Sequence, residues 1–437
     1  MGQFTRRDAM KALGAAAVTA AVPGARVSAA PDYHVVPEKG AKLRLLRWKR
    51  FVQGDEDLWM ANTRKFTEQT GIEVRVESEN FEDIRPKAAV AANVGTGPDI
   101  VIGWYDDPQL YPDKLVDLTE LANYLGAKYG GWYDVCKRYG MRDNRWIGLP
   151  LGAPCGCVTY RQSQIRAAGF DTIPKDFPGF LKLCQALKAK RTPAGLALGN
   201  AVGDANGWCH WVVWGHGGKL VDQHDRVAIN SKETWAALEY AKELYQTFIP
   251  GTLSWLDPNN NKAFLAGEIS LTFNGISIYY VAKTSKDPAL NAIAADIGHT
   301  NYAVGPIGRS AELQALTQAF VFKYTNYPNA AKEYLRFMWE KEQYWPWQEA
   351  SMGYVTQPLA GYEANPVWTE DPKRTPFRDS LKKMQYHGYA GSLGPASAAA
   401  LADYIMVNMV AEAASGASTA KAAAARAEKR AQRYYKS

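Results

Sequence analysis

The chain is poor in the residues that build disulfide frameworks and metal centres. It has 5 cysteines and 6 histidines in 437 residues. The cysteines are odd in number and irregular in spacing, which argues against a disulfide framework. Cys155 and Cys157 lack the two-residue gap of a redox or zinc motif, and the separation of His210 from His216 fits neither helix nor strand registration. We therefore expect structural thiols, no metal and no cofactor.

Long apolar runs and nucleotide motifs are missing as well. After Ala29 no stretch approaches the roughly 18 apolar residues that a membrane-spanning helix needs. The chain contains neither a Gly-x-Ser-x-Gly elbow nor a Gly-x-x-x-x-Gly-Lys-Ser/Thr phosphate loop. Basic residues are spread along the chain instead of clustered, so nucleic acid is not an expected partner.

The first thirty residues have the composition of an export signal. Arg6 and Arg7 precede a mild, alanine-rich apolar stretch over residues 12–22, and residues 27–29 give a small-x-small cleavage pattern. Paired arginines before a short apolar core are typical of the twin-arginine type. Removing residues 1–30 takes away four basic residues and one acidic residue, so the net charge falls from +7 to +4. We expect a periplasmic protein; the alternative is a cytoplasmic chain with an amphipathic start.

The rest of the chain alternates apolar strands with amphipathic helices. Residues 43–48, 72–78 and 98–103 have the pattern of strands, and residues 55–70 and 81–92 between them have the pattern of helices. This alternation predicts a parallel sheet with crossover helices. Ligands bind such sheets beyond the carboxyl ends of the strands, so residues that follow the strand ends are candidates for ligand binding.

The third of these strands ends in an unusual group of side chains. Trp104, Tyr105, Asp106 and Asp107 follow it directly. Aromatic rings can stack on the apolar faces of a sugar, and carboxylates accept hydrogen bonds from its hydroxyls. We expect the two rings to stack on a ligand and one of the two carboxylates to hold its hydroxyls. The other carboxylate would cap the segment that begins at Pro108.

Six segments together resemble the extracellular solute-binding proteins of carbohydrate ATP-binding-cassette (ABC) importers, the group that includes maltose-binding protein. They are FTEQTGIEV, GPDIVIGWYDD, LVDLTEL, WIGLPLG, AFLAGEISLTFNG and AASGASTAKAAAARAE. A further segment, GYAGSLGPASAAALADYIMVNM, resembles a branch that handles sugars or sugar-like polyols other than maltodextrin.

The resemblance implies an α/β, periplasmic-binding-protein-like fold of two α/β lobes joined by a hinge, with a ligand cleft between them. The chain would cross between the lobes near residues 152–157, 301–306 and 339–344. The N-terminal lobe would hold residues 42–152 plus 303–340, and the C-terminal lobe residues 158–301 plus 341–435. The protein would be a monomer without catalytic activity that delivers a carbohydrate or polyol to the membrane permease of an ABC importer.

The ligand-binding candidates come from strand ends, Gly-flanked loops and positions that match the family's binding segments. Several have an alternative: Trp104 and Trp208 could belong to lobe cores and Arg50 to a structural ion pair, while Trp211 and Trp214 fit a core better than a ligand site. Trp255 is a weaker candidate. The full set is Arg50, Gln53, Trp104, Tyr105, Asp106, Asp107, Asn206, Trp208, Asn274, Ser277, Tyr354 and Tyr389. The family often has tryptophan at or near the position of Ser277, and its absence counts against a maltodextrin ligand.

Two other classes of protein fit parts of the pattern. A periplasmic glycosidase needs two carboxylates about 5 to 9.5 Å apart on either side of one bond. Asp106 and Asp107 are adjacent in the chain, so they cannot flank one bond in this way. A receptor for a cationic solute such as a polyamine would combine aromatic residues with several acids, and Arg50 near the cleft argues against it.

Overall fold

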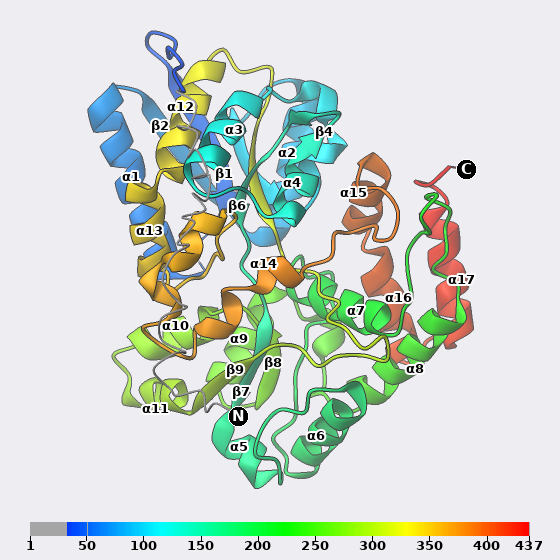
Figure 1. Ribbon diagram of the computed structural model, residues 1–437. Coiled ribbons are helices and arrows are strands. Elements are labelled where there is room, and N and C mark those ends of the chain that lie inside the picture. Colours follow the sequence, from blue (N-terminus) through cyan, green and yellow to red (C-terminus); the bar gives the residue numbers. More distant parts are fainter. Residues whose placement is uncertain (1–32, 50, 437) are drawn as a thin grey trace, which may run out of the picture.

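The chain folds into two α/β lobes, seen one above the other in Figure 1, which confirms the predicted fold class. The computed structural model describes residues 33–49 and 51–436. The predicted export signal and Arg50 therefore lie outside the described residues.

The first lobe is built on a five-stranded sheet in the order β2-β1-β3-β10-β6. Its first three strands are parallel, as predicted, and Leu45 of β1 pairs with both Val76 and Ile100. β10 runs antiparallel to β3 and β6, because the chain returns to this sheet after building the other lobe. The strands are β1 (Lys42–Trp48), β2 (Glu73–Glu79), β3 (Ile100–Trp104), β6 (Leu149–Gly152) and β10 (Thr317–Val321).

Helices cover this sheet and are fixed to it by buried polar contacts. Asp55, in the first turn of α1, accepts hydrogen bonds from Arg47 at 2.6 Å, Trp48 Nε1 at 3.0 Å and Trp347 Nε1 at 2.8 Å. A single carboxylate thus joins β1, α1 and α13. The helices are α1 (Gln53–Thr70), α2 (Phe81–Val94), α3 (Thr119–Lys128), α4 (Asp134–Gly140), α12 (Pro328–Trp339), α13 (Lys341–Ala350) and α14 (Ser380–Lys383). Shorter elements are the 3-10 helices η1 (Asp107–Leu110) and η2 (Pro112–Lys114), and the hairpin of β4 (Met141–Arg142) and β5 (Arg145–Trp146).

The second lobe has a three-stranded antiparallel sheet in the order β8-β7-β9, surrounded by helices (Figure 1). Its strands are β7 (Cys157–Arg161), β8 (Leu271–Asn274) and β9 (Ile297–Thr300). The helices that precede β9 are α5 (Gln162–Ala167), α6 (Phe177–Ala189), α7 (Asp204–Gly215), α8 (Lys232–Tyr245), α9 (Asp257–Leu265), α10 (Ser277–Thr284) and α11 (Pro288–Asp296). The C-terminal helices are α15 (Pro395–Ala402), α16 (Ile405–Ala414) and α17 (Ala420–Ala431), and α16 and α17 pack on α8.

The chain passes between the lobes from β6 to β7 and again from β9 to β10. The sequence predicts a third crossing near residues 339–344, where α12 meets α13, and α13 packs against α1 of the first lobe. Tyr344 and Trp339 explain this placement, because their side chains donate hydrogen bonds to the Leu151 and Pro150 carbonyls of β6. The chain reaches the core of the second lobe again by Ile405.

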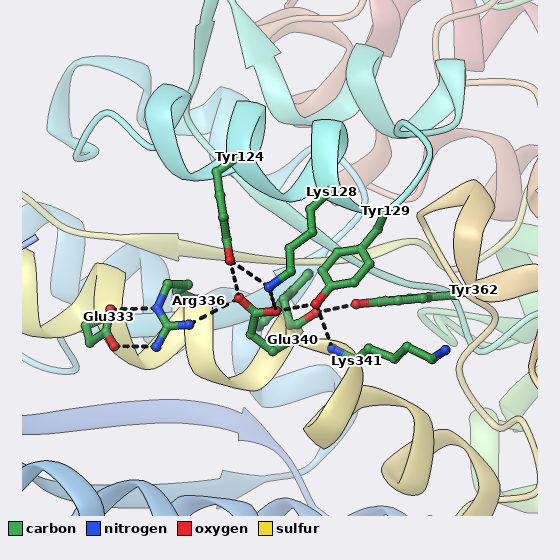
Figure 2. A network of polar contacts seen from close by, with 9 residues as sticks. Tyr124, Lys128, Tyr129, Glu333, Arg336, Glu340, Lys341 and Tyr362 are labelled. Carbon is green, nitrogen blue, oxygen red and sulfur yellow. Dashed lines mark hydrogen bonds and ion pairs between the residues drawn. The ribbon is translucent and has the colours of Figure 1, made fainter. Parts of the chain in front are cut away.

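A polar network around Glu340 also holds the turn between α12 and α13 in the first lobe (Figure 2). The Glu340 carboxylate accepts hydrogen bonds from the Tyr124 hydroxyl at 2.6 Å and from Lys128 Nζ at 2.7 Å, both on α3. Tyr129 donates a further bond to it, and Arg336 Nη1 contributes one at 3.1 Å. Four donors converge on one carboxylate, so this turn is a fixed part of the first lobe.

All five cysteines are buried, unpaired thiols. Within residues 33–49 and 51–436, no helix combines the length and apolar character needed to cross a membrane.

Candidate functional site

A cavity lies between the two lobes. The first lobe contributes Phe51, Phe81 and Tyr354 to its wall, and the second lobe contributes Asp204, Asp257, Asn274 and Ser277. This inner cavity has a volume of about 30 Å³, and an outer cavity of about 480 Å³ shares Phe51 and Phe81 with it. The outer cavity is also lined by Glu82, Lys49 and Lys262.

The first-lobe side of the cavity is an aromatic wall. Phe51 lies 4.7 Å from Phe81 between ring centroids and 6.5 Å from Tyr354, with the Tyr354 ring nearly parallel. Trp104 lies behind this wall, 4.3 Å from Phe81, and donates its indole N–H to the Phe81 carbonyl at 3.0 Å. Trp104 therefore supports the wall from the lobe core instead of forming its surface, which is the packing alternative given above.

The second-lobe side carries two carboxylates. Asp257 accepts backbone N–H bonds from Asp204 at 2.7 Å and from Gly203 at 3.1 Å, and so caps the start of α7. Asp204 accepts a bond from Asn260 Nδ2 at 2.6 Å. Burial raises the pKa of both carboxyls, and the proximity of Asp257 raises that of Asp204 further. Among the described residues no lysine or arginine forms an ion pair with either carboxylate.

Asp106 and Asp107 are adjacent in the chain but have opposite environments. Asp107 pairs with Arg85 at 2.5 Å and accepts the Trp104 backbone N–H at 2.9 Å. Asp106 accepts a bond at 3.0 Å from the hydroxyl of Ser397, on α15, and its Oδ1 has no partner among the described residues. Burial raises the pKa of Asp106 to about 7. The expected cap on the Pro108 segment is not formed, because the Asp107 carboxylate turns back to β3.

Tyr105 and Asn206 meet at the boundary between the lobes. The Tyr105 hydroxyl donates to the Val202 carbonyl at 2.9 Å, and Asn206 Nδ2 donates to the same carbonyl at 3.1 Å. Asn274 and Ser277 line the cavity and are joined to each other by a hydrogen bond of 3.2 Å. Tyr105, Asn274 and Ser277, which were selected at strand ends, and Asn206, which was selected by resemblance, therefore all lie at the boundary between the lobes.

Three other candidates lie elsewhere. Trp208 is buried in the second-lobe core and donates its indole N–H to the Ala197 carbonyl at 2.6 Å. Gln53 is on the exposed start of α1, where its side chain bonds Asp57. Tyr389 borders a separate hollow of about 630 Å³ and accepts a bond from Arg309 Nη2 at 2.6 Å.

The sequence reasoning did not select Phe51, Phe81, Asp204 or Asp257. Phe51 and Phe81 follow the carboxyl ends of β1 and β2, so the rule that selected Trp104 applies to them equally. Asp204 and Asp257 begin helices in the second lobe, where an acidic residue is ordinarily explained by the helix dipole. For the two aspartates the sequence carried no distinguishing signal.

The family of bacterial extracellular solute-binding proteins matches residues 61–376. The chain belongs to this family. Family membership agrees with the architecture, since a cavity between two α/β lobes is where such a fold can enclose a solute. A search of curated proteins found no match.

Solved structures show the same fold across nearly the whole chain. The GacH receptor of Streptomyces glaucescens GLA.O, studied unliganded and with acarbose, is 16% identical, with a TM-score of 0.76 over 91% of this chain and 99% of that one. Maltose-bound MalE3 of T. maritima is 16% identical, with a TM-score of 0.75 over 90% and 99%. A solute-binding protein of an ABC transporter from Thermotoga lettingae TMO, bound with α-D-tagatose, is 16% identical, with a TM-score of 0.76 over 90% and 100%.

Proposed function

We propose that this protein is a periplasmic receptor that captures a sugar or sugar-like polyol and delivers it to the permease of an ABC importer without altering it. The observation that carries the proposal is the composition of the cavity between the lobes. Rings of Phe51, Phe81 and Tyr354 face carboxylate, amide and hydroxyl groups of the second lobe. A sugar presents apolar C–H faces and a rim of hydroxyls, and these two walls match both features.

The three structures described above support the class of ligand. They were determined with acarbose, maltose or tagatose, which are all polyhydroxylated. Their low identity to this chain leaves the particular sugar open. The proposed twin-arginine signal in residues 1–30 would deliver the folded chain to the periplasm.

The proposed mechanism is closure of one lobe on the other. The first lobe would comprise residues 42–152 and 303–384 and the second residues 158–301 and 395–435, each moving as a unit about the connecting segments. A ligand that contacts residues of both lobes binds the closed form more tightly than the open form, so it shifts the population toward closure. The permease would then distinguish loaded from empty receptor by shape.

The Asp204–Asp257 pair favours a second candidate, a receptor for a cationic solute. Two buried carboxylates without a described basic partner would accept a positive charge. A glycosidase could also use a carboxylate pair. However, the Asp257 carboxylate already accepts backbone N–H bonds, which suits a structural cap better than a nucleophile.

One set of titrations separates the three functions. Isothermal titration of the purified protein against a panel of mono- and disaccharides, alditols and putrescine reports what binds. Chromatography of the same saccharides after prolonged incubation reports hydrolysis. We expect saturable binding of at least one saccharide or alditol with quantitative recovery of the ligand. Binding of putrescine alone, or release of hydrolysis products, would refute the proposal.

A further inference from the structure

One face of α7 carries three polar side chains at four-residue spacing: Asn206, His210 and Trp214. Val202, which continues the same face before the helix begins, accepts a hydrogen bond at 2.9 Å from the Tyr105 hydroxyl of the first lobe. Trp208 and Trp211, on the other side of α7, pack with the second-lobe core. The polar face of α7 is therefore turned toward the first lobe.

These three side chains are buried without full hydrogen bonding. Asn206 Oδ1, His210 Nε2 and Trp214 Nε1 have no partner among the described residues, although each side chain is at most 2% exposed. Asp106 Oδ1 and His387 Nδ1 also lack a partner among the described residues, and both side chains are equally buried. We call these five residues the interlobe polar cluster. A buried polar group without a hydrogen bond destabilises the fold, so native proteins contain few of them.

Contacts link the members of the cluster. The His210 ring lies 5.2 Å from the His387 ring and 4.9 Å from the Trp214 ring, between centroids. The His210 ring also bonds the Asn206 carbonyl at 2.8 Å, and the Ser397 hydroxyl bonds Asp106 at 3.0 Å. The members come from α7, from the end of β3 and from the segment that returns to the second lobe.

The hydrogen bonds that Asn206 and His210 already make show which of their unpartnered atoms can accept a further hydrogen bond. His210 Nδ1 lies 2.8 Å from the Asn206 carbonyl, so Nδ1 carries the proton and Nε2 has a free lone pair. Burial lowers the pKa of His210 to about 4, which keeps the ring neutral. Asn206 Nδ2 donates to Val202, which leaves its Oδ1 as the free atom. His387 Nδ1 has no partner among the described residues, and burial lowers the pKa of this ring, which keeps it neutral.

The cluster therefore offers two acceptors, Asn206 Oδ1 and His210 Nε2, one donor, the Trp214 indole N–H, and two groups that can do either, the Asp106 carboxyl and the neutral His387 ring. A hydroxyl group donates one hydrogen bond and accepts others, so several neighbouring hydroxyls of one ligand match this set. An ammonium group has no lone pair for Trp214, and Arg85 places a positive charge near Asp106 and His387. The set of groups favours neutral hydroxyls over an amine.

We propose that the interlobe polar cluster is a second binding wall of the cleft, in which His210, His387 and Trp214 join Asp106 and Asn206 in holding neighbouring hydroxyls of the ligand. This inference rests on the proposed function and adds His210, His387 and Trp214 to the site. The ligand reaches the wall while the lobes are apart, because both lobes contribute to it.

Two matched pairs of variants on or beside α7 test the wall. Trp214→Phe removes the indole N–H, and Trp211→Phe is its control, because Trp211 is equally buried and donates to the Ala303 carbonyl outside the interlobe polar cluster. His210→Phe removes the acceptor, and His216→Phe is its control, because His216 makes the same bond to the helix backbone outside the cluster. Titration uses the saccharide or alditol of the panel that binds wild type most tightly. We expect Kd to rise about 3- to 10-fold for Trp214→Phe and His210→Phe, and less than 2-fold for the controls.

Nitrogen-15 NMR of the histidine rings gives a second readout that needs no substitution in the cluster. Binding should shift the Nε2 signal of His210 and leave that of His216 unchanged. If wild type binds a saccharide but both variants keep its Kd and the His210 signal does not move, the cluster holds water only, and the inference fails while the proposed function stands. If glucosamine binds more tightly than glucose, the preference for neutral hydroxyls is refuted. If no saccharide or alditol binds wild type, the proposed function itself fails.

Discussion

Replacing Asp106 by asparagine should make the protein more stable at neutral pH, although it removes a polar group from the site. Asp106 is fully buried, and its charge has one hydrogen-bond donor, the Ser397 hydroxyl. Burial raises its pKa from 3.8 to about 7. The folded state therefore binds the proton more tightly than the unfolded state does.

The sign and size of the effect follow from this difference. Between about pH 4 and pH 7 the folded state holds more protons than the unfolded state, so the free energy of unfolding falls as pH rises through this window. A shift of roughly 3 units at ~1.4 kcal/mol each corresponds to ~4 kcal/mol as an upper bound. Asparagine removes this cost but weakens the bond to Ser397, so we expect Asp106→Asn to gain about 1 to 3 kcal/mol at pH 7.

Asp107→Asn is the matched control with the opposite sign. Asp107 pairs with Arg85 at 2.5 Å, and the two side chains are 2% and 14% exposed. Removing one partner leaves a mostly buried guanidinium without its counter-charge, which costs about 3 to 5 kcal/mol. The same conservative change at two neighbouring positions should therefore stabilise in one case and destabilise in the other.

Denaturant unfolding of wild type and both variants, followed by tryptophan fluorescence at pH 4.5 and pH 7.5, measures these differences. We expect the gain of Asp106→Asn to be largest at pH 7.5 and small at pH 4.5. A variant that is less stable than wild type at pH 7.5 would show that the Asp106 charge is compensated in the fold, and the reasoning about this site would be wrong.

Three further substitutions test the roles given to buried groups of the lobes. Asp55→Ala leaves Arg47 uncompensated between β1 and α1 and should lower the free energy of unfolding by about 3 to 5 kcal/mol. Trp208→Phe should lower the free energy of unfolding by about 1 to 3 kcal/mol, because the Ala197 carbonyl loses its donor. Ligand affinity should stay within twofold of wild type. A large loss of affinity with intact stability would show that Trp208 belongs to the binding site. Glu340→Gln should lower the unfolding midpoint at pH 7, since Lys128 and Arg336 lose their shared negative charge. Ligand affinity should not change. An unchanged midpoint would mean that the network of Figure 2 contributes little to stability.

Local patterns predicted the elements of the first lobe well. The strands β1, β2 and β3 and the helices between them follow from apolar periodicity, acidic residues at the start of α1 and Gly71 at its end. The antiparallel β10 could not be predicted in the same way, because its place between β3 and β6 depends on a return from the other lobe. The contacts of α13 with α1 and β6 likewise join segments that are far apart in the sequence, so local patterns do not report them.

The site was predictable only where its residues follow strand ends. This rule found Tyr105, Asp106, Asn274 and Ser277 at the lobe boundary, but it could not tell a ring that faces the cavity from one that packs behind it, as Trp104 does. Whether Trp104 faces the cavity depends on the direction of its side chain, and packing against Phe81 sets that direction. The sequence analysis assigned Trp214 to a core and found no metal-ligand spacing at His210, and only their missing hydrogen-bond partners distinguish them.

The affinity of the best-binding saccharide for Phe51→Ala, measured by isothermal titration beside wild type, tests the central claim most directly. Phe51 lines both the inner and the outer cavity. Loss of a stacking ring should cost about 1 to 3 kcal/mol, by analogy with stacked bases, so Kd should rise roughly 5- to 150-fold. The same Kd for variant and wild type would place the ligand outside the cavity between the lobes and contradict the account.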